Sequence, residues 1–294
     1  MSLNLWILIS LCAGFSRAFL LASQKELIKS KYSSLQVSFG SILFAFPLIF
    51  IVFVSQSGGF PSNIQPITII AIGVSGVCNI TGFLAYLKAL KIEDLSIVAP
   101  LASFTPIFVA FGEPLLRGVT LTIPTLTGAI ITVIGSLLIV SDNPKDIPQI
   151  LKRLKETGPI FAVGSAFIYA SASIADKTAT SMANPYFVMF GVSLIMLIGF
   201  GCIILLQNRQ KEVKMSSVLR KEFIPVGIFQ AGLSILIFPA FSLAPTASHV
   251  IIIIQVSLII DVIIGWVVFN ETDIFKRFIG GAIIFCGIGV ATLF

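Results

Sequence analysis

The sequence predicts an all-α integral membrane protein with ten transmembrane helices, arranged as two inverted five-helix repeats. Hydrophobic residues make up 56% of the 294 positions and charged residues only 11%, and the mean hydropathy is +1.04. Such a chain has too little polar surface to cover a water-soluble globule. The apolar residues also recur in ten stretches, and the second five echo the first five at an offset of 152 positions. These observations together predict the fold class.

Each predicted span has about the 20 apolar residues that a helix needs to cross a bilayer. The spans are 3–22, 33–54, 67–87, 96–116, 123–140, 159–175, 185–206, 223–242, 247–268 and 275–294. The connectors between them are too short for an independent soluble core. We therefore expect one repeat over residues 1–140, a connecting loop over 141–158 and a second repeat over 159–294.

Glycines show the echo between the two halves most clearly. At the offset of 152, the aligned residues are Gly118, Gly128 and Gly135 with Asn270, Gly280 and Gly287. Each half holds an odd number of spans, so the two halves enter the membrane in opposite orientations. Secondary transporters built in this way place one binding site near the midplane, between two opposed gates.

The net charge of +6 is carried by short connectors rather than by one soluble face, which argues against a nucleic-acid partner. With ten spans, sixteen of the Lys and Arg residues fall on the side opposite the N-terminus, and only Arg117 and Lys177 fall on the N-terminal side. By the positive-inside rule, the side with sixteen basic residues is cytoplasmic. The sequence therefore predicts a protein of the cell membrane with both termini outside.

From Ala89 the chain reads ALKIEDLSIVAPLASFTPIFVAF and then LLRGVTLTIPTLTGAIITVIGSLLI. The order of an Ala-Leu pair, a proline-bearing helix, a turn and a final helix with Gly at every seventh position resembles the repeat of the EamA family of the drug/metabolite transporter superfamily. The second half ends in the same way, with Phe269-Asn270-Glu271 followed by two glycines. Two positions depart from the pattern, since the turn glutamate is Val119 in the first half and the helix proline is Leu258 in the second.

The resemblance implies ten helices, transport of small organic solutes and a cavity lined by the first, third, fourth, sixth, eighth and ninth helices. It also implies cytoplasmic termini, which is the reverse of what the charge distribution predicts. It implies no particular solute.

Three ionisable residues stand inside the predicted spans, where an unpaired charge is costly. Arg17 and Asp261 lie about 7 Å and 6 Å from the middle of their spans toward the same membrane side, by the rise of an α-helix. We therefore expect them to pair across the cavity, either as a functional pair or as a packing device. Glu113 lies about 10 Å toward the other side and needs another partner, and the following Pro114 is a candidate helix end that would leave this carboxylate at an interface.

Further polar residues recur at helical spacing and mark a candidate cavity wall. Asn79 and Gln230 are also typical of hydrogen bonds between membrane helices, while aromatic rings can stack on an organic solute. The remaining candidates for the cavity are Tyr86, Ser103, Tyr169 and Ser257. Pro100 and Pro106 interrupt the fourth span, where each removes a backbone donor, and they predict a bend that could act as a gate hinge.

The function that these features favour is a secondary transporter for a small polar or amphipathic metabolite, such as an amino acid or a related compound. The chain has no G-x-x-x-x-G-K-[ST] fingerprint for ATP, so the expected driving force is a solute or ion gradient. Asp261 and Glu113 are the candidate residues for proton coupling and for the cavity. An uncoupled facilitator or channel-like pore fits the same pattern. A membrane enzyme is disfavoured by the single histidine and the scattered acids, and we expect neither a cofactor nor a metal. The expected partners are the solute, protons and the lipid bilayer.

Overall fold

The structure is a computed structural model, and it describes residues 3–30, 32–93, 98, 101–140, 155–209, 218–269 and 274–293. Within these ranges all regular structure is helical. Seven of the described helices are long and apolar enough to cross a membrane by length and composition, and two shorter apolar helices cover Ile123–Ile139 and Phe278–Thr292. The all-helical class is therefore confirmed, and ten crossings stay a prediction.

The chain divides into two compact units, and each unit combines segments from both halves of the sequence. Unit 1 comprises Met1–Ile80 and Ala175–Leu243, and unit 2 comprises Thr81–Ile174 and Ala244–Phe294. Within unit 1, residues 34–57 pack against their counterparts in 185–209, and within unit 2, residues 123–140 pack against theirs in 274–293. This is the arrangement expected of an inverted repeat, in which like elements gather around a common axis.

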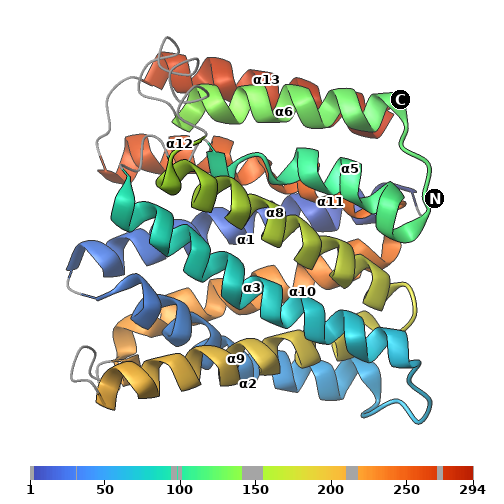
Figure 1. Ribbon diagram of the computed structural model, residues 1–294, viewed down its shortest axis with the longest axis vertical. Coiled ribbons are helices and arrows are strands. Elements are labelled where there is room, and N and C mark those ends of the chain that lie inside the picture. Colours follow the sequence, from blue (N-terminus) through green and yellow to red (C-terminus); the bar gives the residue numbers. More distant parts are fainter. Residues whose placement is uncertain are drawn as a thin grey trace. The chain divides into compact units, whose positions relative to one another are not determined.

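Unit 1 is built on four long helices: α1 (Leu3–Ser30), α2 (Ser34–Ser57), α9 (Pro185–Arg209) and α10 (Ile224–Leu243). It also contains the start of α3 (Pro66–Ile92), the end of α8 (Thr157–Thr180) and the short η4 (Lys221–Phe223). α1 packs against α10, α10 against α2, and α2 against its counterpart α9. Figure 1 shows α2 and α9 side by side.

Local sequence signals set the ends of α2. Ser33 and Gln36 form a capping box, in which the Gln36 N–H donates to the Ser33 hydroxyl and the Ser33 N–H donates to the Gln36 side chain. Gly58 ends the helix with φ at +66°, a conformation that favours glycine. The helix starts and stops where the sequence predicts a span.

Phenylalanine packing and close helix contacts form the core of unit 1. Phe53 stacks on Phe190 at 4.5 Å between ring centroids, and this joins α2 to α9. Gly227 brings α10 against α2, because a Cβ at this position would lie 2.9 Å from the carbonyl carbon of Phe44. Only glycine permits so close an approach of two helix backbones.

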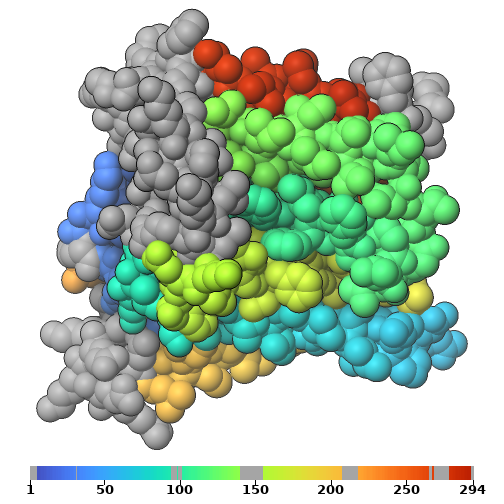
Figure 2. Space-filling view, turned by 45° about the horizontal axis from the view of Figure 1, so that its top comes forward, coloured from blue at the N-terminus to red at the C-terminus, as the bar shows by residue number. Residues whose placement is uncertain are grey.

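Unit 2 contains α5 (Thr105–Arg117), α6 (Ile123–Val140), α11 (Ala247–Ile254), α12 (Val256–Phe269) and α13 (Ile274–Leu293). α6 and its counterpart α13 pack along each other, as Figure 2 shows in green and red. The repeated glycines form this contact.

At Gly128 a Cβ would lie 2.7 Å from the carbonyl oxygen of Gly287, and at Gly135 it would lie 2.6 Å from that of Gly280. Gly128 and Gly135 are the counterparts of Gly280 and Gly287 at the offset of 152. Each glycine therefore meets the counterpart of the other, in an antiparallel pair with the reciprocal contacts of a two-fold axis. The inverted-repeat architecture is confirmed at this helix pair.

Large apolar side chains point away from both units into their surroundings. Leu115 is 85% exposed and Ile123 is 79% exposed. Apolar exposure on this scale, together with the spans, identifies an integral membrane protein, in which hydrocarbon rather than water covers these side chains.

Several helices extend further than the sequence predicted, and for α1 and α8 the extension changes the setting of a charged residue. α1 runs to Ser30, eight residues past the predicted end, so its midpoint falls between Ser16 and Arg17. The predicted displacement of Arg17 from the middle of its helix was therefore wrong. α8 runs to Thr180 and carries Lys177 within it, where the side chain is buried, so this lysine does not lie in a connector.

The helix of Glu113 also extends past the candidate end at Pro114. α5 continues to Arg117 and stops at Gly118, which has φ at +68° and an N–H that donates to the Pro114 carbonyl. The missing N–H of Pro114 removes only one bond of the helix, and α5 tolerates it.

Candidate functional site

Two helices of unit 2 are interrupted at equivalent positions. Ser103 and Phe104 form a turn just before α5, and Gln255 separates α11 from α12. Ser103 and Gln255 are 152 positions apart. At each interruption the backbone adopts the tighter i→i−3 pattern: the Phe104 N–H donates to the Leu101 carbonyl at 3.3 Å, and the Gln255 N–H to that of Ile252 at 3.2 Å.

Proline accounts for only the first of these interruptions. Pro106 lies in the first turn of α5, where a helix does not need the missing N–H. The Ala102 carbonyl, which Pro106 cannot bond, instead accepts from the Thr105 hydroxyl at 3.1 Å. The second interruption has Leu258 at the equivalent position. The break is therefore common to both repeats, while Pro100 lies outside the described residues.

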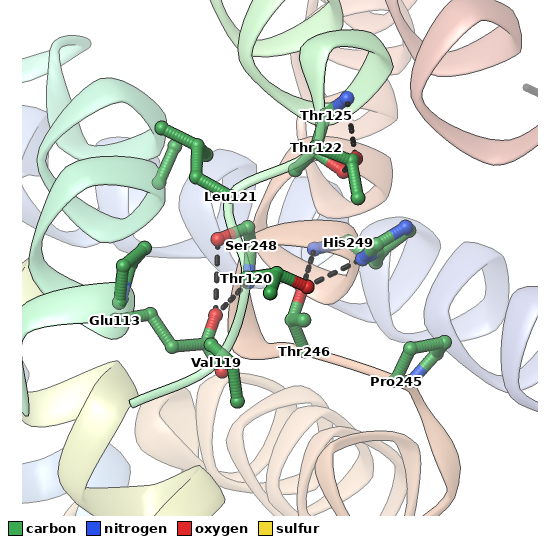
Figure 3. A pocket seen from close by; sticks show the side chains of 12 residues that line it. Glu113, Val119, Thr120, Leu121, Thr122, Thr125, Pro245, Thr246, Ser248 and His249 are labelled. Atoms are coloured by element: carbon green, nitrogen blue, oxygen red, sulfur yellow. Dashed lines mark hydrogen bonds between the residues drawn. The ribbon is translucent and has the colours of Figure 1, made fainter. Parts of the chain in front are cut away.

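A pocket of about 390 Å³ opens in unit 2 where the end of α5 meets the start of α11 (Figure 3). Glu113 lies at its base and is only 1% exposed. Its carboxylate accepts from the Ala247 N–H at 2.8 Å, from the Ser248 N–H at 3.1 Å and from the Ser248 hydroxyl at 3.0 Å. It also forms an ion pair with Arg117, one turn further along α5.

These contacts give Glu113 the partners that the sequence could not name. The first N–H groups of a helix lack partners within the helix and carry a partial positive charge. Glu113 supplies the anion that α11 needs there, from a segment more than 130 residues away in sequence. The carboxylate is therefore anchored at a junction between two helices.

Hydroxyl groups line the rest of the pocket. Thr246 caps α11, since its hydroxyl accepts from the His249 N–H and lies 2.6 Å from Nδ1 of the His249 ring. On the opposite wall the hydroxyls of Thr122 and Thr125 lie 2.7 Å apart. The pocket offers hydrogen-bond donors and acceptors to a polar group (Figure 3).

In unit 1 the polar stripe of α3 is bonded largely within its own helix. The Asn79 amide donates to the Ser75 carbonyl at 2.9 Å and to the Ser75 hydroxyl at 3.3 Å. On α10, the Gln230 amide lies 3.4 Å from the Ser234 hydroxyl. These bonds give each amide nitrogen a partner on its own helix. A role in the cavity stays a prediction for both residues.

Arg17 and Asp261 belong to different units. Arg17 is a half-buried residue of α1 in unit 1, and Asp261 is a half-buried residue of α12 in unit 2. Each has an interaction partner in the structure. Their mutual pairing therefore stays a prediction.

The remaining candidates lie in unit 2. Tyr86 packs against the buried cluster of Ala89, Val98, Leu101 and Ala162. The Tyr169 ring lies beside Gly82, where a Cβ would be 3.4 Å from the ring. Ser257 is fully buried on α12, and its hydroxyl has no hydrogen-bond partner in the described part of the chain. A buried hydroxyl without a partner is a reasonable place for a ligand or water.

Comparison with known proteins identifies the family. The sequence model of the EamA-like transporter family matches residues 4–141 and 156–293, which together cover nearly the whole chain. The chain belongs to the EamA-like transporter family. The EamA match falls twice, once on each half, and so agrees with the doubling seen in the glycines.

The fold also resembles solved structures. One of them, described only as "Crystal structure of protein", is 18% identical, with a TM-score of 0.68 and 98% of each chain covered. At this identity the likeness shows the fold alone. No curated protein matches the chain.

Sequence reasoning missed two buried charges of this EamA protein. Asp176 and Lys177 are 7% and 4% exposed on α8, beyond the predicted end of that span. The Lys177 ammonium donates to the Phe241 carbonyl at 2.6 Å. That carbonyl lacks a helical donor, because the residue four positions later is Pro245. The sequence signal for this acceptor was Pro245, which stands four residues after Phe241.

Proposed function

We propose that this EamA-family protein is a secondary transporter that moves a small polar or amphipathic organic solute by alternating access. The observation that carries the proposal is the pair of equivalent helix interruptions at Ser103–Phe104 and Gln255. Breaks in membrane helices leave backbone groups that only a protein-lined or water-lined cavity tolerates. In inverted-repeat transporters such breaks form the solute site and move with the gates.

The residues near the interruptions supply suitable chemistry. Ser103 and Ser257 offer hydroxyls, and Asp261 offers a charge for an amine or guanidine group of the solute. Amino acids and related compounds carry an amine that fits this set, and the sequence offers Arg17 as the candidate for their carboxylate. Tyr86 and Tyr169 supply rings for an apolar part of the solute.

Counterflow in proteoliposomes tests the proposal. Vesicles loaded with one unlabelled compound at a time, from a set of amino acids, amines and nucleosides, should transiently accumulate the same compound in labelled form. Protein-free liposomes serve as the control. Only a carrier with a site that faces one side at a time can exchange solute in this way.

The same experiment separates the rival functions. Flux that grows linearly with concentration, without exchange, would identify a channel-like pore in place of a carrier. Exchange that no ion gradient can drive uphill would identify an uncoupled facilitator. Absence of transport for every compound class in a folded, oriented preparation would contradict the proposal.

A further inference from the structure

Asp176 has a buried carboxyl group that does not line the pocket of unit 2 and that takes no part in the helix packing described above. It lies in the last turns of α8, within unit 1, and is 7% exposed. The Ser75 hydroxyl of α3 donates to it. Its other oxygen, Oδ1, is buried and has no hydrogen-bond partner among the described residues. Burying a carboxylate oxygen without a partner costs roughly several kcal/mol. Protonation of the carboxylate removes that cost.

Among the described residues, one thiol and one neighbouring lysine bear on the charge of this carboxyl group. The titratable side chain of α3 that interacts with it electrostatically is Cys78, one turn from Ser75. The neighbouring Lys177 does not neutralise it, because consecutive residues of a helix point about 100° apart and the Lys177 ammonium bonds the Phe241 carbonyl of α10. Asp176 thus has a hydroxyl donor and a thiol near it, but no described cation bonded to it.

The hydrogen-bond partners of Glu113 differ from those of Asp176. Both oxygens of Glu113 are occupied, by two backbone N–H groups, one hydroxyl and one guanidinium. That set donates to both oxygens and holds the side chain in place. Asp176 lacks such a set, so the gain or loss of one proton at Oδ1 breaks no other bond of the carboxyl group.

The geometry points to Asp176 as a proton-binding site of this protein, and we infer that its protonation couples solute movement to a proton gradient. The chemical step is only the binding of H⁺ to Oδ1, which converts the carboxylate to a neutral acid that can donate a hydrogen bond. The coupling part rests on the proposed transport function, whereas the binding of the proton does not.

The other repeat has a neutral side chain at the equivalent position. Gln24 is the counterpart of Asp176 at the offset of 152, and its amide donates to the Ser41 hydroxyl at 3.2 Å. Asp176→Asn should therefore fold. Ser75→Ala tests the same site without changing the carboxyl group. Ser10→Ala is its matched control, because the bond that the structure describes for the buried Ser10 hydroxyl is to the Trp6 carbonyl of its own helix.

Infrared spectroscopy of the purified full-length protein tests proton binding directly. As the pH falls, the wild type should show a protonated-carboxyl stretching component, beside that of the exposed carboxyl groups, which is absent from Asp176→Asn. It should persist in Glu113→Gln. Ser75→Ala should leave a larger fraction protonated at each pH, and Ser10→Ala should match the wild type. A band that survives Asp176→Asn unchanged, or that Na⁺ abolishes at constant pH, would overturn the proton assignment.

Proteoliposomes test the coupling separately, with a compound that shows counterflow in the wild type. A pH gradient should drive its accumulation in the wild type, and Asp176→Asn should lose this accumulation while keeping counterflow. Gradient-driven accumulation that persists in Asp176→Asn would refute the coupling. If no compound shows counterflow, the transport proposal fails, and the infrared result still decides whether Asp176 binds a proton.

Discussion

At the scale of single residues, Glu113 shows how a charge is held inside an apolar bundle. Its carboxylate combines the capping of α11 with an ion pair to Arg117 on the same helix. The ion pair alone is of the i,i+4 kind and contributes little when exposed. Glu113 is only 1% exposed, so these bonds contribute more than exposed ones would. If the carboxylate were removed, its donors would have no water to replace the lost acceptor.

Glu113→Gln should therefore destabilise the protein by about 1–3 kcal/mol. An amide keeps one acceptor oxygen but turns its NH2 group toward either the Ala247 N–H or the Ser248 N–H, and it leaves Arg117 without its anion. Thermal unfolding of the purified protein measures the effect, with Glu26→Gln, an exposed acid of α1, as the control. Transport per folded molecule should be unchanged. A variant as stable as the control would show that the cap is not needed.

Arg17 and Asp261 make a different prediction, about activity. Arg17→Ala and Asp261→Ala should each lower solute uptake per folded protein roughly tenfold or more, because a bond to a charged group contributes about 1.5–3 kcal/mol. The exposed Lys29→Ala is the control. If the two bind solute, the double variant should be as inactive as either single variant. Recovery of uptake in the double variant would identify a packing pair instead, since it removes a stranded charge.

Tyr32 carries the pH-dependent prediction. Its hydroxyl donates to Glu222 at 2.5 Å, and its ring packs edge-on against Phe223. The hydrogen bond to Glu222 raises the pKa of Tyr32 above its ordinary value of 10.0, because ionisation would remove the donated proton. The stabilisation is therefore fully present below pH 10 and is lost as the pH rises through the raised pKa.

Tyr32→Phe should lower the unfolding temperature at neutral pH, and the difference from the wild type should vanish at strongly alkaline pH. Thermal scans at a series of pH values measure both effects. Tyr186→Phe is the matched control, since the described bonds of Tyr186 involve its backbone rather than its hydroxyl. A difference that stays constant with pH would rule out the hydroxyl bond as its cause.

The sequence predicted some of these residues and not others, for a physical reason. Arg17, Glu113 and Asp261 interrupt long apolar runs, so composition alone marks them. Asp176 and Lys177 follow directly on Ala175 and read as the start of a connector. The buried Lys177 ammonium donates to the Phe241 carbonyl, 64 residues along the chain, which Pro245 leaves without a helical donor. Hydropathy in a window cannot register a partner at that distance.

At the scale of elements, the glycines of α6 and α13 have the clearest role. The doubling of the glycine pattern was visible in the sequence, but the pattern does not state which helices face each other. The structure pairs each helix with its own counterpart, so that Gly135 touches the backbone at Gly280. The contact is between backbones, and a side chain on either helix would have to push them apart.

Gly135→Ala should therefore destabilise the protein by about 1–3 kcal/mol through overpacking. Gly289→Ala in α13 is the matched control, because nothing lies within 4 Å of its added methyl group. That control should be neutral or up to about 1 kcal/mol more stable, as alanine is the better helix former. Equal unfolding temperatures for the two variants would contradict the close contact of α6 and α13.

The helix interruptions show a limit of local signals at the same scale. Pro106 predicted the first break. The Thr105 hydroxyl donates to the Ala102 carbonyl, which the proline cannot bond. The second break has no proline and was not predicted. The tight turn at Gln255 has the same hydrogen-bond pattern as the turn at Ser103 and Phe104 in the first repeat. Comparison of the two repeats could therefore have predicted it, whereas no single residue could.

At the scale of the whole molecule, the two compact units cut across the two sequence repeats. The sequence could predict the repeats because each is continuous in the chain, and the family match falls on the same halves. It could not predict the units, because they assemble from equivalent helices that are far apart in sequence, such as α2 with α9 and α6 with α13. Packing between equivalent surfaces decides that grouping.

Orientation in the membrane also belongs to this scale, and the structure sharpens the charge argument for it. Lys177, one of two basic residues assigned to the N-terminal side, is buried in α8 rather than placed in a connector. The other, Arg117, is paired with Glu113. If the chain crosses the membrane ten times, the basic residues left to set the topology lie on the opposite side, and the positive-inside rule predicts that this side is cytoplasmic.

We accordingly predict that exposed Ser181, between α8 and α9, faces the outside and that Lys152 faces the cytoplasm. An impermeant thiol reagent on intact cells should label Ser181→Cys and not Lys152→Cys, in a background that lacks Cys12, Cys78, Cys202 and Cys286. Permeabilised cells should allow labelling of both and so serve as the control. The reverse pattern would show that the usual EamA orientation, with cytoplasmic termini, holds despite sixteen basic residues on the outer side.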